Sequence, residues 1–184
     1  ERPANRQAEK FGKICHGEIK MIRATAPVRI DLAGGTLDIY PLYLFTGGGL
    51  TVNAAIGLRS EAVLSENDGQ SVTIKCENLY DDSYNISETF ALDTVDMSGK
   101  LSLLKRLIKF YSPDAGIDME VKTRAPPGSG LGGSSSIAMA VSAALGRLTG
   151  KTYRGDHLVN IACNIEAQDL GVPAGRQDHY AALN

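Results

Sequence analysis

The sequence predicts an α+β fold, with strands in the first part of the chain and helices in the second. Two runs, "SVTIKCEN" and "GIDMEVKT", alternate apolar and polar residues as half-buried strands do. Three later stretches place apolar residues at the spacing of a helix face. At 184 residues, with 43% apolar and 22% charged side chains, the chain is long enough for one domain with a sizeable core.

The expected strands begin after a polar leader at residues 1–19, and residues 20–184 form the expected folded domain. The stretch "IKMIRATAPVRIDLAGG" predicts two short strands that break at Pro27. "GGGLTVNAAIGL" predicts another strand after a glycine turn. The alternating runs at residues 71–78 and 116–123 complete the expected sheet.

Three helices are expected from apolar stripes at residues 101–111, 137–148 and 158–165. Ser98 is a candidate N-cap for the first helix, and Gly150 is a plausible stop for the second. The third ends near Gly171 and Pro173. We expect the stripes to pack on the sheet and to carry the fold rather than the chemistry.

Charge and cysteine content exclude several classes of protein. The 19 basic and 21 acidic side chains give a net charge of −2, which offers no general attraction for nucleic acid or anionic lipid. No apolar run is long enough for a membrane span. The odd, widely spaced Cys15, Cys76 and Cys163 suggest neither a disulfide framework nor a zinc site, so a reducing, cytoplasmic location is expected.

The stretch "TRAPPGSGLGGSSSIAMAVSAALGRLTG" contains a G-x-G-x-x-G at Gly128, Gly130 and Gly133. A dinucleotide fingerprint requires an acidic residue on a second strand about 20 residues further on. The segment "GKTYRG" at that distance has neither an acid nor a strand pattern. The NTPase P-loop is also excluded, because no G-K-[ST] follows.

The remaining features of this stretch still favour a phosphate site. Pro126 and Pro127 end a strand, and the glycines allow unusual backbone angles or close approach to a ligand. Ser134, Ser135 and Ser136 then open a helix, whose amides and positive dipole end attract anions. The alternative is a glycine loop with a serine N-cap and no ligand.

Two carboxylates near the end of the chain add a second feature. Glu166 lies late on a helix, and a turn of Gly171, Pro173 and Gly175 precedes Asp178. This turn could bring both carboxylates to one site. One could then bind Mg²⁺ while the other accepts a hydroxyl proton.

These motifs together resemble those of the GHMP family of small-molecule kinases. "PPGSGLGGSSS" is similar to the family's phosphate loop, P-x-x-x-G-L-G-S-S-A, and "APVRIDLAGGTLDIYPLY" is similar to its first motif. The run from Glu166 to Asp178 matches the galactokinase segment with a magnesium-binding glutamate and a catalytic aspartate. The resemblance implies a mixed sheet with helices on one face, a left-handed βαβ connection, and a C-terminal GHMP domain that this chain does not contain.

The resemblance also implies roles for particular residues. ATP would bind the glycine-rich loop, and Mg²⁺ would bind Ser134 and Glu166, although Gly133 replaces the family's first serine and leaves Ser135 as an alternative ligand. Asp178 would be the catalytic carboxylate, supported by Arg29. The expected loop contacts are Pro127, Gly128, Ser129, Gly130, Leu131, Gly132, Gly133, Ser134 and Ser135, and the expected substrate contacts are Gly35, Asp38 and Arg176.

Within the family, "RIDLAGGTLDIYPLYLFTGGGL" and "GRQDHYAA" are similar to the branch that phosphorylates heptose 7-phosphate and L-fucose on the anomeric hydroxyl. The expected activity is an ATP- and Mg²⁺-dependent sugar kinase, with a small sugar or sugar phosphate as partner. Alternatives are a non-catalytic sugar- or nucleotide-binding module, and another GHMP chemistry such as mevalonate phosphorylation. His179, next to Asp178, is expected to point away from the substrate.

Overall fold

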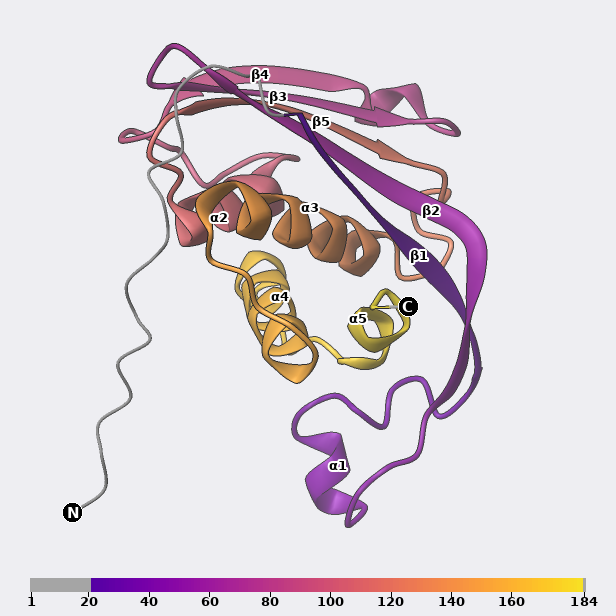
Figure 1. The fold of residues 1–184 in the computed structure, drawn as a ribbon. Coiled ribbons are helices and arrows are strands. Elements are labelled where there is room, and N and C mark those ends of the chain that lie inside the picture. The colour runs from indigo at the N-terminus through magenta and orange to yellow at the C-terminus, as the bar shows by residue number, and fades with distance from the viewer. Residues whose placement is uncertain (1–20, 184) are drawn as a thin grey trace, which may run out of the picture.

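A computed structural model describes residues 21–183, so the leader expected at residues 1–19 lies outside the described residues. The described part forms a five-stranded sheet with helices beneath it (Figure 1). The strands are β1 (Ile22–Ala33), β2 (Val52–Asn67), β3 (Ser71–Asn78), β4 (Ile86–Ala91) and β5 (Gly116–Thr123). The helices are α1 (Leu42–Phe45), α2 (Ser102–Tyr111), α3 (Gly133–Thr149), α4 (Asp156–Leu170) and α5 (Gln177–Ala181), with a short 3₁₀ turn at Asp82–Tyr84.

The sheet is mixed, as expected, with strand order β1-β2-β5-β3-β4. Neighbouring strands are antiparallel except β3 and β5, which are parallel and are connected through β4 and α2. Helices α2 and α3 lie under one face, and α4 and α5 lie beneath α3, so the helices gather on one side (Figure 1). The left-handed sense of the connection stays a prediction.

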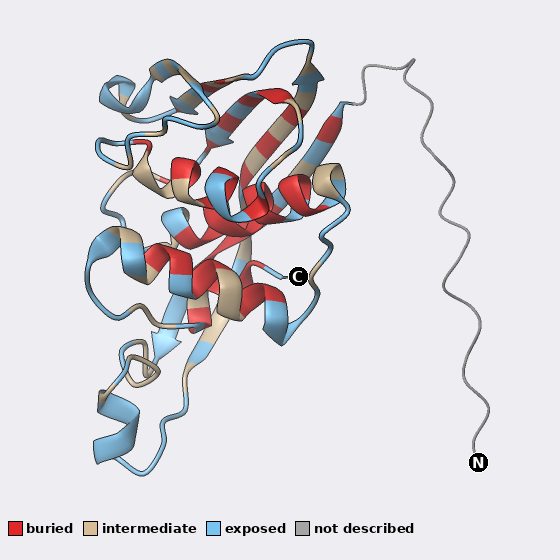
Figure 2. Cartoon of the chain, turned by 90° about the vertical axis from the view of Figure 1, so that its left-hand side faces the viewer, coloured by how far each residue is buried: buried red, intermediate tan, exposed pale blue. Residues whose placement is uncertain are grey.

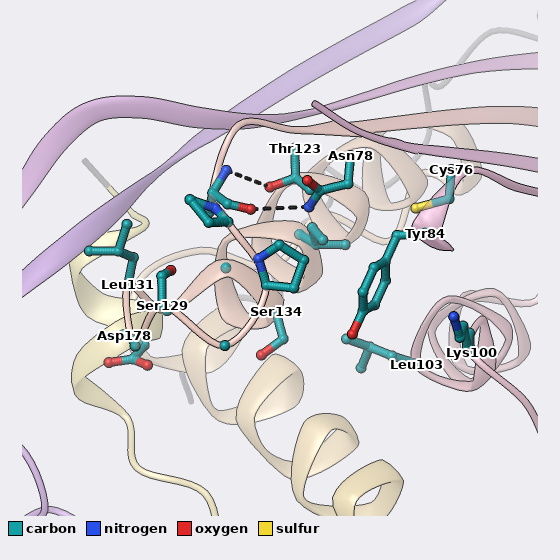
Figure 3. A pocket seen from close by; sticks show the side chains of 18 of the residues that line it. Cys76, Asn78, Tyr84, Lys100, Leu103, Thr123, Ser129, Leu131, Ser134 and Asp178 are labelled. Atoms are coloured by element: carbon teal, nitrogen blue, oxygen red, sulfur yellow. Dashed lines mark hydrogen bonds between the residues drawn. The ribbon is translucent and has the colours of Figure 1, made fainter. Parts of the chain in front are cut away.

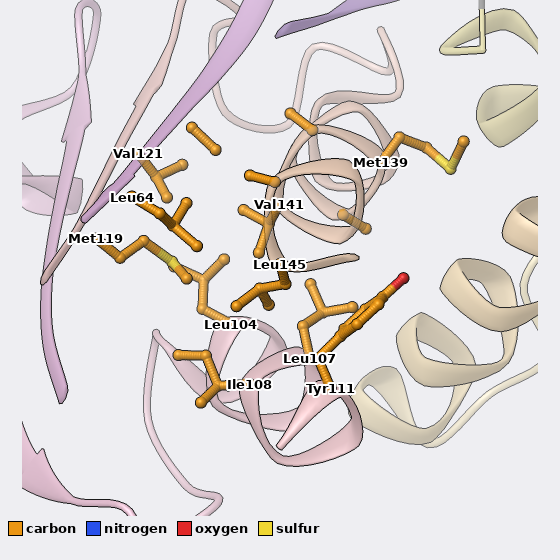
Figure 4. Packing of buried hydrophobic residues seen from close by; sticks show 14 of the residues in the cluster. Leu64, Leu104, Leu107, Ile108, Tyr111, Met119, Val121, Met139, Val141 and Leu145 are labelled. Carbon is orange, nitrogen blue, oxygen red and sulfur yellow. The ribbon is translucent and has the colours of Figure 1, made fainter. Parts of the chain in front are cut away.

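The core lies between the sheet and helices α2 and α3. Leu64 of β2 and Met119 of β5 face Val141 and Leu145 of α3 (Figure 4). Buried residues occupy the faces that the layers turn toward one another, and the segment around α1 is mostly exposed (Figure 2). Burial of these apolar faces fixes the position of the loop between β5 and α3.

The strands expected at residues 71–78 and 116–123 are confirmed with those bounds. The expected break at Pro27 is wrong, because β1 continues through this residue with a register shift between Pro27 and Arg29. Because β1 is an edge strand, the missing amide of proline removes no bond from the interior of the sheet. Strand β4 and the short helices α1 and α5 were not expected.

The three expected helices are confirmed, and Gly150 and Gly171 end α3 and α4 in left-handed conformations. The expected cap at Ser98 is wrong, because α2 starts after Leu101 without a side-chain cap. Ser98 instead donates its hydroxyl and amide to the carboxylate of Asp96. Within residues 21–183, no helix has the length and apolar content that a membrane crossing requires.

Candidate functional site

The glycine-rich loop between β5 and α3 forms one wall of a pocket of about 590 Å³. The loop takes up this path because Gly128, Gly130 and Gly132 all have positive φ, between 68° and 72°. Pro127 through Ser134 line the pocket, whereas Ser135 is buried and does not. Figure 3 shows the pocket running from Asp178 at one end to Tyr84 and Lys100 at the other.

Arg29 of β1 joins Asp178 of α5 to the glycine-rich loop. Its Nε and Nη2 atoms lie 2.7 Å from Oδ1 of Asp178, and Nη1 donates to the carbonyl of Gly130. The backbone amide of Arg29 also donates to the carbonyl of Leu131, at 3.0 Å. The guanidinium therefore fixes the carboxylate of Asp178 against the loop at one end of the pocket.

Glu166 of α4 lies behind this wall, with 4% of its surface exposed. Ser134 donates its hydroxyl to Oε1, and Ser135 donates its hydroxyl to Oε2 at 2.8 Å. His179 of α5 places Nε2 3.0 Å from Oε2. The buried carboxylate thus accepts two hydrogen bonds from α3 and has an ion-pair contact with α5, and such partners offset the cost of burying a charge.

The pKa values of Asp178 and Glu166 are shifted in opposite directions. Burial raises the pKa of Asp178 above its ordinary value, and the charge and hydrogen bonds of Arg29 oppose this shift without cancelling it. Burial also acts to raise the pKa of Glu166, but hydrogen bonds from His179, Ser134 and Ser135 outweigh it, so the pKa is lowered. The surroundings therefore favour the ionised form of Glu166 and the protonated form of Asp178, each relative to the same group in water.

The expected substrate residues lie near the start of α5. Oδ2 of Asp38 accepts hydrogen bonds from the backbone amides of Arg176, at 2.5 Å, and Gln177, at 2.8 Å. The side chain of Gln177 donates to the carbonyl of Gly35. The side chain of Arg176 is exposed. Oδ1 of Asp38 is buried and has no hydrogen-bond partner among residues 21–183.

The structure therefore brings Arg29, Asp178 and the loop together, and places Glu166 behind Ser134. Sequence reasoning missed the contact of His179 with Glu166 and the hydrogen bonds of Gln177. The direction of His179, away from the pocket, was expected from its position next to Asp178, because consecutive helical residues point about 100° apart. This spacing directs His179 inward when Asp178 faces the pocket.

Replacing Gly132 by alanine should destabilise the fold by more than about 1 kcal/mol. Gly132 has φ of +72°, and an added Cβ would lie 3.1 Å from Cγ and Oδ2 of Asp178. Gly150→Ala is a matched control, because Gly150 has φ of +73° but an added Cβ would meet nothing within 4 Å. Urea unfolding measures both variants. Equal losses would contradict the crowding of Asp178.

Replacing Asp38 by alanine should lower the free energy of unfolding by about 1–3 kcal/mol, because two amides at the start of α5 lose their acceptor. For a chain of this size, thermal unfolding should shift by about 2–4 °C per kcal/mol. Asp38→Asn keeps an acceptor oxygen and should lose less. An unchanged melting temperature for Asp38→Ala would show that α5 does not need this contact.

Fold and site together define a class of protein. The family description "GHMP kinases N terminal domain" matches residues 101–184. The solved structures similar to this chain include a D-glycero-D-manno-heptose 1-phosphate kinase from Bacteroides thetaiotaomicron. That match has a TM-score of 0.75 and 30% identity, and covers 88% of this chain and 53% of the other. The chain carries the N-terminal domain of the GHMP kinases.

Curated relatives agree with this conclusion. The chain is 30% identical over 169 residues to the D-glycero-alpha-D-manno-heptose 7-phosphate kinase of Campylobacter jejuni, which covers 89% of this chain and 48% of the relative. It is 27% identical to the L-fucokinase/L-fucose-1-P guanylyltransferase of Bacteroides fragilis, over 89% of this chain and 20% of the relative. The chain thus spans about half the length, or less, of these relatives.

Proposed function

We propose that this chain is the ATP-binding lobe of an ATP- and Mg²⁺-dependent kinase that phosphorylates a hydroxyl group of a sugar. The observation that carries the proposal is the placement of Asp178. Its carboxylate is held by Arg29 against a glycine-rich loop, at one end of a pocket. A positioned carboxylate beside a phosphate-binding loop is what transfer of a phosphoryl group to an alcohol requires.

The pocket is suited to a nucleotide. At the loop end, α3 begins at Gly133 without a side-chain cap, so its first amides are available to phosphate oxygens. At the other end, Leu103, Ile137 and the ring of Tyr84 offer an apolar surface for a base. A pocket of about 590 Å³ lies within the usual range for small-molecule sites.

The metal would be held by Ser134 and Glu166, whose oxygens are of the type that Mg²⁺ prefers. Ser134 fits this role better than Ser135, because Ser134 is exposed and lines the pocket, whereas Ser135 is 3% exposed. Three described side chains contact the carboxylate of Glu166. Ser135 and His179 contact Oε2, and Ser134 alone of these three contacts Oε1. When bound, the ion would neutralise phosphate charge.

In the proposed reaction, Asp178 accepts the proton of the sugar hydroxyl. The hydroxyl oxygen bonds to the γ-phosphorus of ATP, the bond from this phosphorus to the bridging oxygen breaks, and ADP leaves. Arg29 keeps Asp178 in place and stabilises negative charge that develops on the transferred group. Its hydrogen bond to the carbonyl of Gly130 holds the guanidinium, and with it Asp178, at a fixed position beside the loop.

The anomeric hydroxyl of a heptose 7-phosphate or of a fucose-like sugar is the proposed acceptor. The support is the similarity to heptose and fucose kinases. Gly35, Asp38 and Arg176 stay the proposed substrate contacts, and the buried Oδ1 of Asp38 has no hydrogen-bond partner among residues 21–183. The exposed guanidinium of Arg176 is available to a phosphate on the substrate.

The test is an ATP-consumption screen with Mg²⁺ over D-glycero-D-manno-heptose 7-phosphate, L-fucose, galactose, mannose and mevalonate. The screen uses both this chain and the full-length protein. Turnover on a sugar supports the proposal and names the acceptor. Turnover on mevalonate alone contradicts the sugar assignment. Nucleotide binding without turnover in the full-length protein would indicate a non-catalytic binding module.

The proposed role of Asp178 predicts the pH dependence of turnover. Because its pKa is raised, kcat/KM should fall as the pH decreases through a value above about 3.9, the ordinary pKa of aspartate. The basic form is the active one, so the loss occurs on the acid side. A pH–rate profile that is flat down to about pH 4 would contradict a raised pKa.

A further inference from the structure

We infer that His179 is a positioning residue for Glu166. It holds one carboxylate oxygen inside the protein, so that the other oxygen faces Ser134, a residue of the pocket wall. The metal-binding part of this inference rests on the proposed function, whereas the orientation of the carboxylate does not. The roles assigned above in phosphoryl transfer and in metal binding do not include one for His179.

The contacts of Glu166 divide its two oxygens into an inner and an outer one. Oε2 is contacted by Ser135 at 2.8 Å and by His179 at 3.0 Å, and both of these residues are buried. Oε1 is contacted by Ser134, which is exposed and lines the pocket. A ligand that enters through the pocket therefore reaches Oε1 after it displaces one serine hydroxyl, while Oε2 keeps both of its contacts.

The imidazole of His179 is suited to this task because it has no exposed surface. Its Nε2 atom lies 3.0 Å from Oε2 of Glu166 as an ion-pair contact, and among residues 21–183 neither ring nitrogen has a hydrogen-bond partner of standard geometry. Among residues 21–183, Glu166 is therefore the polar side chain that contacts the imidazole of His179. Burial of a polar ring is costly unless a partner compensates it, so the pair fixes the rotamers of both side chains.

The backbone of α5 explains why one short segment serves two carboxylates. Asp178 and His179 are neighbours on α5, and consecutive helical side chains diverge by about 100°. Asp178 points to Arg29 and the pocket, and His179 points inward to Glu166. Docking of α5 therefore places the proposed base and orients the proposed metal ligand in one step.

Three variants of the full-length protein test this inference. His179→Leu removes the ring nitrogen that lies 3.0 Å from Oε2. His179→Gln keeps a polar N–H group in a side chain of similar reach. His157→Leu replaces an exposed histidine on α4 and is the control. The first measurement is the crystal structure of each variant. We expect Glu166 to keep its orientation in the Gln and control variants and to rotate in His179→Leu. An unchanged Glu166 in His179→Leu would overturn the inference, whatever the protein's activity.

The second measurement is the affinity for ATP, determined by calorimetry once with Mg²⁺ and once with EDTA. It does not depend on turnover. His179→Leu should weaken the Mg²⁺-dependent part about 10-fold to 100-fold and leave binding in EDTA unchanged. His179→Gln should restore most of the loss. Equal weakening with and without metal would overturn the positioning role in favour of a general structural one. Wild-type protein that binds no Mg²⁺–ATP would contradict the proposed function, and the crystal structures would still decide the orientation of Glu166.

Discussion

Asp178→Asn in the full-length protein should lower turnover by about 10²-fold to 10⁴-fold, the usual contribution of a positioned general base. Asparagine keeps an oxygen that accepts hydrogen bonds from Arg29, so the loop and the guanidinium stay in place. It has no basic group for the proton of the sugar hydroxyl. Binding of ATP, measured by calorimetry, should stay close to that of the wild type.

Asp169→Asn is the matched control for this variant. Asp169 lies at the same pocket and also pairs with an arginine, Arg106, at 3.1 Å. Its substitution removes a carboxylate that pairs with Arg106 instead of Arg29, so turnover at saturating ATP should persist. Wild-type turnover in Asp178→Asn, or equal losses in the two variants, would show that Asp178 is not the base.

Arg29→Lys should lower kcat/KM by about 10²-fold to 10³-fold, as the loss of a preorganised charged donor does. Arginine uses three nitrogens here, two toward Asp178 and one toward the carbonyl of Gly130. The single ammonium of lysine preserves the charge but cannot make both contacts in the planar geometry of arginine. The expected result is a loss in kcat together with a less well-ordered loop, measured by steady-state kinetics and by hydrogen exchange of residues 128–133.

Arg23→Lys provides the control on the same strand. Arg23 pairs with Glu61 at 3.4 Å, and 66% of its side chain is exposed, so the exchange should change neither activity nor loop protection. Full activity in Arg29→Lys would indicate that positive charge alone suffices at this position. That outcome would remove the proposed link between the loop and Asp178.

Local sequence patterns predicted the parts of the fold that local physics determines. The alternation in β3 and β5 and the apolar stripes of α2, α3 and α4 describe which face of each element is buried. Pro27 shows the limit of this reasoning. Its effect on a strand depends on whether that strand lies at the edge of the sheet, and the edge position of β1 is a property of the whole fold.

The same limit applies to the site. The glycine-rich loop was predicted from its own residues. The hydrogen bonds of the carboxylates near the loop, by contrast, join residues that are far apart in the sequence. Asp38 reaches the amides at the start of α5 across 138 and 139 positions, and Glu166 meets Ser134 and Ser135 across 32 and 31. No periodicity encodes such distances. The donors of a buried carboxylate become visible only when the elements are assembled.

Because α5 is short, the site can lose its structure at a lower free energy than the rest of the fold. A helix of five residues does not persist in isolation, so α5 depends on its contacts with β1, β2, α3 and α4. Segments held in this way open locally at a lower free energy than the global unfolding of a domain. Such an opening would release both Asp178 and His179 while the sheet and its core stayed intact. Mild heat or denaturant should therefore inactivate the protein before it unfolds, and ligands that hold α5 in place should protect activity more than they raise the melting temperature.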